Sequence, residues 1–353
     1  MVVGLAVAAG LGAATAADAQ TRSAQRDGAP AARSAVQIPS QGAQRQSANR
    51  QSANRQSAKR KPNAQRRSVV RRPARPSEGM IAGLHKVDDP LDLRSSVALV
   101  VDQDTEEVLF EKNPQAVLPI ASITKLMTAL VTVEADLPLD EELVVTRSDR
   151  TIDRVASRLV PGVRLTRGQA LHLALMSSEN HAAQMLGRNY PGGLSAFVDA
   201  MNAKAQMLGM HDSRFADPTG LSPENRSSPA DLVRLVKAAY DHEVIREFSV
   251  SSGATMKVGK RMVSYGTTNR LIANPDWDIG LQKTGFISAA GRCLVMSAVV
   301  EGQRVVMVLL DSVGKYSRIG DAQRIRDWLQ NRPLLSADAP KPAISVEAVA
   351  PAM

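Results

Sequence analysis

Cysteine, histidine and aromatic residues are scarce in this chain of 353 residues. The single cysteine, Cys293, excludes an intramolecular disulfide and any metal site built from several thiolates. A helical zinc-protease motif is excluded as well, because Arg246 stands where a second histidine must follow His242-Glu243. We therefore predict neither a metal ion nor another cofactor. Aromatic residues make up 3% of the chain, so the hydrophobic core has to consist mainly of Leu, Val, Ala and Met.

Apolar runs long enough to cross a bilayer are also lacking. The uncharged run of residues 2–16 is too short for a span, and Ala17-Asp18-Ala19 follows it as a small-x-small pattern. We interpret residues 1–19 as a secretory signal peptide, which predicts a periplasmic protein without a transmembrane anchor. No Lys or Arg precedes the run, so either the natural start lies upstream or the amino terminus supplies the positive charge.

Acidic residues are almost missing from the next segment. Residues 20–77 hold fourteen Lys or Arg and one acidic residue, a net charge of +13. The whole chain carries +9 and Asp18 carries −1, so the net charge of residues 78–353 is −3. The repeated unit Gln46-Ser47-Ala48-Asn49-Arg50 cannot bury a core, so we predict a disordered basic linker over residues 20–83. The segment lacks aromatic residues that stack on bases, so we expect it to bind anionic envelope polymers or lipid headgroups and not nucleic acid.

Residues 84–332 carry the periodic patterns of a folded domain, and the Ala- and Pro-rich residues 333–353 are predicted to be a disordered tail. The predicted elements are strands 95–102 and 107–112, helix 122–135, strand 144–147, helices 165–176, 182–188, 193–208 and 229–240, strands 281–284, 293–300 and 304–310, and helix 319–330. Strands thus precede and follow a block of helices. This order argues against a doubly wound parallel sheet and favours a mostly antiparallel sheet with a helical insertion.

Three short motifs occur in order along this domain. Ser122-Ile123-Thr124-Lys125 opens an amphipathic helix, Ser178-Glu179-Asn180 lies between two helices, and Lys283-Thr284-Gly285 ends a predicted strand. Taken alone, the first motif is better explained by a capping serine and a solvated lysine. The three together, S-x-x-K, S-x-N and K-T-G, are typical of serine β-lactamases and penicillin-binding proteins.

The chemistry that these residue types support is acyl transfer. Ser122 would be the nucleophile and Lys125 its base, provided that burial, the helix N-terminus and the second cation Lys283 lower the lysine pKa. Lys125 should then be desolvated and close to both Ser122 and Ser178. Ser178 would pass a proton to the leaving amine, and Asn180 would hold Lys125 and the substrate amide.

The K-T-G strand is predicted to bind the substrate as an added strand. Lys283 and Thr284 would bind the substrate carboxylate, and Gly285 would leave the strand edge open to close approach.

The chain resembles the low-molecular-mass penicillin-binding proteins of the D-alanyl-D-alanine endopeptidase/carboxypeptidase family, peptidase family S11. The resemblance covers roughly residues 84–332 and includes LPIASITKLMTALV, LALMSSENHAA, FADPTGLS and LQKTGFISAAGRCLVM, while YPGG, MNAKA and KTGF are closer to the endopeptidase branch. It implies the α+β fold of serine β-lactamases and DD-peptidases, with helices flanking the sheet and a helical subdomain. It also implies cleavage of D-Ala–meso-diaminopimelate cross-links through an acyl-Ser122 intermediate, acylation by β-lactams, and an oxyanion site at the N–H groups of Ser122 and Phe286.

Other readings stay open. A carboxypeptidase of the same family is the first alternative, and a serine β-lactamase that uses Glu224 to position water is the second. A non-catalytic envelope-binding protein is the third, although the three intact motifs argue against it. We expect Glu179 and His181 to be partly exposed helix-turn residues, Cys293 to be a core residue, and His172 and His211 to lie at the surface.

Overall fold

The computed structural model describes residues 75–150 and 157–332. The predicted signal peptide, most of the predicted linker and the C-terminal tail lie outside these ranges. Residues 75–83, which we had assigned to the linker, are described and contain the short helix α1 (Glu78–Ile81). Its first residue is tied to the domain, because the Glu78 backbone N–H donates to the Ala289 carbonyl at 2.9 Å.

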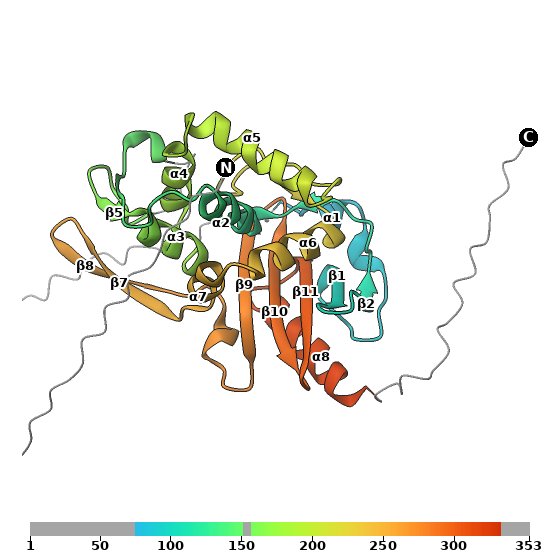
Figure 1. Ribbon diagram of the computed structural model, residues 1–353. Helices are drawn as coiled ribbons and strands as arrows, with labels where there is room; N and C mark the ends of the chain where they lie inside the picture. Colours follow the sequence, from blue (N-terminus) through green and yellow to red (C-terminus); the bar gives the residue numbers. More distant parts are fainter. Residues whose placement is uncertain (1–74, 151–156, 333–353) are drawn as a thin grey trace, which may run out of the picture. The chain divides into compact units, whose positions relative to one another are not determined.

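A five-stranded antiparallel sheet with the order β2-β1-β11-β10-β9 forms the centre of the domain (Figure 1). Its strands are β1 (Ser95–Asp102), β2 (Val108–Lys112), β9 (Asp278–Ile287), β10 (Gly291–Val300) and β11 (Gln303–Ser312). Neighbouring residues of β1 point to opposite faces of the sheet, and all eight are buried. Both faces of the sheet are therefore covered, which explains why β1 reads as a continuous apolar run and not as an alternating one.

Different helices cover the two faces. Helix α8 (Ser317–Asn331) packs through Ala322 and Ile325 on the side that carries Val100 and Leu309. The opposite side packs against the helical block (Figure 1). The block consists of α2 (Thr124–Glu134), α3 (Arg167–Met176), α4 (Asn180–Arg188), α5 (Gly193–Met207), α6 (Pro229–Tyr240) and α7 (Glu243–Val250).

Short elements fill the connections. The 3-10 turns are η1 (Leu84–Lys86), η2 (Ala121–Ile123), η3 (Arg147–Asp149) and η4 (Arg270–Ala273). The small two-stranded sheets pair β3 (Leu118–Pro119) with β6 (Arg226–Ser227), β4 (Glu142–Val144) with β5 (Arg164–Thr166), and β7 (Gly253–Val258) with β8 (Arg261–Gly266).

The predicted architecture, a mostly antiparallel sheet with a helical insertion, is confirmed. Helix 229–240 matches α6 at both ends, and the strand predicted at 281–284 is the middle of the longer β9. Lys283-Thr284-Gly285 therefore lies inside a strand and does not end one. Helix α7 and the β7–β8 hairpin were not predicted from the sequence, because a helix of eight residues and strands of six give only a short pattern.

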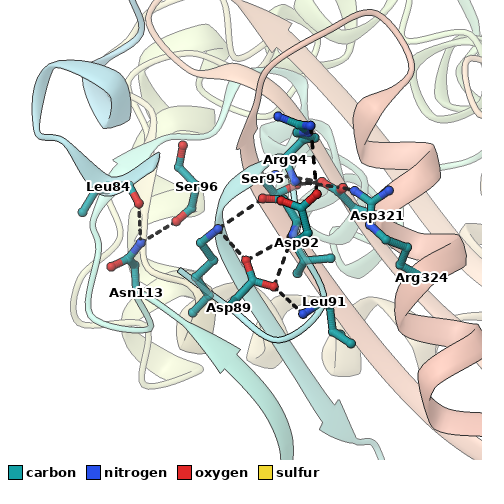
Figure 2. Close-up of polar contacts among 12 residues, drawn as sticks. Leu84, Asp89, Leu91, Asp92, Arg94, Ser95, Ser96, Asn113, Asp321 and Arg324 are labelled. Atoms are coloured by element: carbon teal, nitrogen blue, oxygen red, sulfur yellow. Dashed lines mark hydrogen bonds and ion pairs between the residues drawn. The ribbon is translucent and has the colours of Figure 1, made fainter. Parts of the chain in front are cut away.

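The segment before β1 is fastened by side-chain contacts (Figure 2). Asp89 accepts from the backbone N–H of Leu91 at 2.9 Å and forms a buried ion pair with Lys112 at 2.7 Å. Asp321 of α8 accepts from the backbone N–H groups of Arg94 and Ser95 at 3.0 and 2.8 Å. These contacts connect the start of β1 to the last helix of the domain.

Among the helices of residues 75–150 and 157–332, none is both long and apolar enough to span a membrane.

Candidate active site

Ser122 lies in the 3-10 turn η2 directly before α2, where the sequence predicted a first-turn residue. The preceding residue, Ala121, has a φ of 48°, a left-handed conformation that costs a non-glycine residue free energy and is common at functional sites. Gly285 of β9 lies against this turn: a Cβ there would be 2.9 Å from the Ile120 carbonyl oxygen and 3.1 Å from the Ser122 nitrogen. A glycine on the strand thus permits the close approach of β9 to the nucleophile.

Lys125 is fully buried and is not the solvated lysine of the simpler reading. Its Nζ lies 2.9 Å from Ser122 Oγ, 2.7 Å from Asn180 Oδ1 and 2.6 Å from the Thr219 carbonyl oxygen. Burial lowers the pKa of Lys125 to about 7, against the opposing effect of the Asp217 and Glu179 carboxylates. A substantial fraction of the amine is therefore neutral near physiological pH.

The contacts of Nζ define how the neutral amine is oriented. Asn180 Oδ1 and the Thr219 carbonyl are acceptors, so they take the two N–H groups of a neutral amine. The remaining lone pair is then available to the Ser122 hydroxyl. This is the arrangement that a general base for serine requires.

Ser178 lies in the turn between α3 and α4, as predicted, and Asn180 is the first residue of α4. Ser178 has a φ of 60°, and its hydroxyl accepts a hydrogen bond from Lys283 Nζ at 3.0 Å. Among the described residues, no hydrogen bond connects Lys125 to Ser178, whereas Lys125 is bonded to Asn180 of the same motif. The two lysines lie on either side of the S-x-N turn, one bonded to Asn180 and the other to Ser178.

Lys283 is fully buried and also donates to the Thr284 carbonyl at 2.8 Å. Burial holds its pKa well below the usual range, and the neighbouring cations Lys125 and Arg318 act in the same direction. Its Nζ is thus bonded to two groups of the protein itself, Ser178 Oγ and the Thr284 carbonyl oxygen, and its contact with a substrate carboxylate stays a prediction. Thr284 instead faces Thr268, with 2.7 Å between the two hydroxyl oxygens.

A cavity of about 260 Å³ brings six of the eight predicted residues together. Its lining consists of Ser122, Ser178, Asn180, Leu221, Thr268, Thr284, Gly285, Phe286 and Arg318. The two lysines, Lys125 and Lys283, lie just behind this wall. Thr284, Gly285 and Phe286 of this lining belong to β9, which is the edge strand of the sheet and can accept a peptide as an added strand.

Arg318 was missed by the sequence analysis. It lies on α8, 8% exposed, and lines the cavity, while its Nε and Nη1 have no hydrogen-bond partner in the described part of the chain. A buried guanidinium without a partner is suited to bind a carboxylate. No local pattern in the sequence announces it, because Arg318 reaches the site only through the packing of α8 on the sheet.

Asp217 was also missed, although it stands in the FADPTGLS segment quoted above. Its carboxylate accepts from the backbone N–H groups of Thr219, Gly220 and Ser222 at 2.6, 2.8 and 3.0 Å and from the Asn225 side chain at 2.7 Å. Burial opposes ionisation, but these hydrogen bonds hold the pKa of Asp217 below its usual range. The carboxylate thus fixes the loop whose Thr219 carbonyl contacts Lys125.

Several smaller expectations need correction. Glu179 and His181 are 9% and 8% exposed, so they are buried and not half-exposed turn residues. His172 is half-buried and stacks on Phe248, with 4.7 Å between the ring centres. Glu224 is exposed and does not line the cavity, which removes the water-positioning glutamate that the β-lactamase reading needed. Cys293 is fully buried, as expected of a core residue.

No group of three or more His, Cys, Asp or Glu side chains is placed to hold a metal ion in the ranges that the structure covers. The absence of a cofactor stays a prediction.

The sequence matches the D-alanyl-D-alanine carboxypeptidase family, peptidase S11, over residues 84–314. Among curated relatives, the D-alanyl-D-alanine endopeptidase of Pseudomonas aeruginosa is 47% identical over 242 residues, which cover 68% of this chain and 78% of the relative. The D-alanyl-D-alanine endopeptidase of Escherichia coli is 42% identical over 251 residues, which cover 70% of this chain and 81% of the relative.

Solved structures agree with this similarity. The Streptomyces K15 DD-transpeptidase superposes with a TM-score of 0.63 at 26% identity, covering 69% of this chain and 98% of that chain. A D-alanyl-D-alanine carboxypeptidase from Mycobacterium tuberculosis gives a TM-score of 0.64 at 26% identity, covering 70% and 95%. Both the predicted fold class and the predicted family are confirmed. With its motif residues gathered around one cavity, this chain belongs to the D-alanyl-D-alanine carboxypeptidase family, peptidase family S11.

Proposed function

We propose that this chain is a serine-type DD-endopeptidase that hydrolyses the D-Ala–meso-diaminopimelate bond of peptidoglycan cross-links through an acyl-Ser122 intermediate. The observation that carries the proposal is the buried Lys125, whose Nζ lies 2.9 Å from the Ser122 hydroxyl. The two relatives named endopeptidase, at 47% and 42% identity, favour cross-links over free stem ends as substrates.

Acylation begins when Ser122 Oγ attacks the D-Ala carbonyl carbon and its proton moves to neutral Lys125. The developing oxyanion is stabilised by backbone N–H groups, for which Ser122 and Phe286 are our candidates. Ser178 gives its hydroxyl proton to the leaving amine and is reprotonated from Lys283, the donor 3.0 Å behind it. Before deacylation, Lys125 gives its proton to solvent and Lys283 takes one up, so both lysines return to their starting states. Water then attacks the acyl carbon and passes a proton to the neutral Lys125. Lys125 gives this proton to Ser122 Oγ as the ester bond breaks, which releases the D-Ala carboxylic acid and restores Ser122.

The carboxylate next to the scissile amide is bound by Arg318 and Thr284. Both line the cavity beside Ser122, and Arg318 offers the two N–H positions without a partner. Lys283 donates hydrogen bonds to Ser178 Oγ and to the Thr284 carbonyl oxygen and so holds these two residues in place. We therefore assign carboxylate recognition to Arg318 in place of Lys283.

Two measurements test the proposal. Incubation with purified cross-linked muropeptide dimers should give monomers, while loss of D-Ala from pentapeptides without cleavage of dimers would identify a carboxypeptidase. Carboxypeptidase activity is the second candidate function, because the similar structure from Mycobacterium tuberculosis is named a D-alanyl-D-alanine carboxypeptidase.

The assignment of the nucleophile is tested with a fluorescent penicillin. It should label the wild-type protein covalently and leave Ser122→Ala unlabelled. Glu224→Ala, a change at an exposed residue of the neighbouring loop, serves as the matched control and should label normally. Labelling of Ser122→Ala at the wild-type rate would contradict the assignment.

We also propose that the enzyme acts in the periplasm and that its basic segment, residues 20–77, binds anionic envelope polymers. The support is the net charge of +13 on this segment, against −3 on the chain from residue 78 onward.

A further inference from the structure

Two exposed aromatic rings and three cations form a surface next to the catalytic cavity. Phe286 and Tyr316 are 55% and 44% exposed. The Arg292 guanidinium lies 4.5 Å from the centre of the Phe286 ring, and Arg270 and Lys315 lie 4.4 and 5.1 Å from the centre of the Tyr316 ring. We name these five residues the aromatic-cationic platform.

The cations of this platform have no carboxylate partners. In residues 75–150 and 157–332, no ion pair includes Arg270, Arg292, Lys315 or the adjacent Arg318. Some surface cations elsewhere are paired, as Arg304 is with Asp104 and Lys237 with Glu106. Four unneutralised cations at one place raise the local positive potential and favour an anionic ligand.

The platform continues into the catalytic cavity. Phe286 belongs to both, and Arg318 lines the cavity. Burial lowers the pKa of Arg318, and the positive charge of Arg292 lowers it further, which places these two cations within electrostatic range of each other. The pKa of the Tyr316 phenol is also lowered, first by a hydrogen bond from Lys315 and then by the charges of Arg270 and Arg292. Arg270, Arg292 and Lys315 of the platform and Arg318 of the cavity therefore contribute to one positively charged surface.

We infer that the aromatic-cationic platform binds the carboxylate-bearing stem peptide that leaves as the amine when a cross-link is cut. This inference rests on the proposed endopeptidase function. The cavity, at about 260 Å³, is smaller than the roughly 300–1,000 Å³ of ordinary ligand pockets. A leaving group larger than alanine has to extend over the surface outside it.

The chemistry of the leaving group selects this surface. A released D-Ala has a single carboxylate, for which Arg318 is sufficient. A released stem has a carboxylate next to the cut amide, as D-Ala does, and also the free carboxylate at the C-terminus of its own peptide, and so brings further negative charge to the rim of the cavity. The three platform cations complement this charge, and the two ring faces supply flat apolar area for the peptide.

The test compares two reactions of the same variant. The first is kcat/KM for a purified cross-linked muropeptide dimer, and the second is the rate constant for acylation by a fluorescent penicillin, which carries no second stem. In Arg270→Glu/Lys315→Glu the ratio of the first to the second should fall by about tenfold or more, mainly through KM. Because both reactions need a folded Ser122 site, partial misfolding cancels in the ratio.

Lys86→Glu/Arg261→Glu is the matched control, since it makes the same charge change at two exposed cations outside the platform. Its ratio should stay at the wild-type value. An equal fall in the control would mean that net charge alone steers the substrate, and an unchanged ratio in the platform variant would mean that the stem does not touch it. Either result overturns the inference. If the wild-type protein removes D-Ala from pentapeptides but cuts no dimer, the proposed function itself fails.

Discussion

Lys125 shows how one residue changes its chemistry with its surroundings. A lysine in water is charged at neutral pH and cannot accept a proton from serine. In this fold the side chain is fully buried, two acceptors hold its N–H groups, and its pKa falls to about 7. Burial, more than any single partner, makes it a base.

A pH dependence follows from this value. The neutral form of Lys125 is the active one, so the acylation rate should rise as pH increases through about 7 and level off above it. Below that pH the rate should fall about tenfold per pH unit, because the neutral fraction of Lys125 shrinks by that factor. The measurement is the rate constant for labelling by a fluorescent penicillin between about pH 5 and pH 9. A flat profile, or an inflection near the usual lysine pKa, would contradict the assignment of Lys125 as the base.

At the scale of elements, three segments far apart in the sequence converge on η2. Strand β9 approaches through Gly285, the Asp217–Asn225 loop approaches through Gly220, and α4 contributes Asn180. Gly220 has a φ of 77°, and a Cβ there would lie 1.9 Å from the Ala121 carbonyl oxygen. Since that distance is far inside van der Waals contact with backbone, any side chain at Gly220 would displace the turn that carries Ser122.

Gly220→Ala should therefore lower the acylation rate strongly, by about a hundredfold, since small displacements of a reacting group carry large costs. Gly259→Ala is the matched control: its φ is 61°, and no heavy atom lies within 4 Å of the added Cβ. In both variants the left-handed conformation of the new alanine should lower the free energy of unfolding by about 1–2 kcal/mol, which thermal unfolding measures. Only Gly220→Ala should lose penicillin labelling. Equal labelling of the two variants would show that the contact with Ala121 does not position the nucleophile.

At the scale of the whole molecule, charge is divided sharply along the chain. Residues 20–77 carry +13, whereas the chain from residue 78 onward is mildly acidic at −3. The basic segment should therefore control binding to anionic polymers, and the catalytic domain should control chemistry. Removal of the basic segment should therefore weaken binding to anionic polymers and leave the activity of the catalytic domain unchanged.

A chain that begins at residue 75 should elute from an immobilised anionic polymer at much lower salt than the full chain. Salt weakens the attraction because it screens exposed charges beyond about 8 Å at physiological ionic strength. The shortened chain should keep the full rate of penicillin labelling, which serves as the internal control. Retention of both forms at the same salt concentration would mean that the basic segment is not the binding element.

The sequence by itself was sufficient for the family, the order of the main elements and the motif residues. Ser122, Ser178, Asn180, Thr284, Gly285 and Phe286 meet at one cavity as the motifs predicted. These conclusions are accessible because periodicity and short motifs are local properties of a chain. The apolar period of 122–135 and the Pro at the start of 229–240 each define their helix without reference to the rest of the fold.

Only the tertiary structure decided which groups meet across the site. It brought Arg318 of α8 and Ser122 to the same cavity, joined Lys283 to Ser178 by a hydrogen bond, and supplied the Thr219 carbonyl that accepts from Lys125. It also showed that Glu179 and His181 are buried. Burial and the meeting of distant segments depend on how helices and sheet pack, and no local pattern records that packing. The same packing lowers the pKa of Lys125 to about 7, as the proposed base requires, because burial disfavours the charged form of the amine.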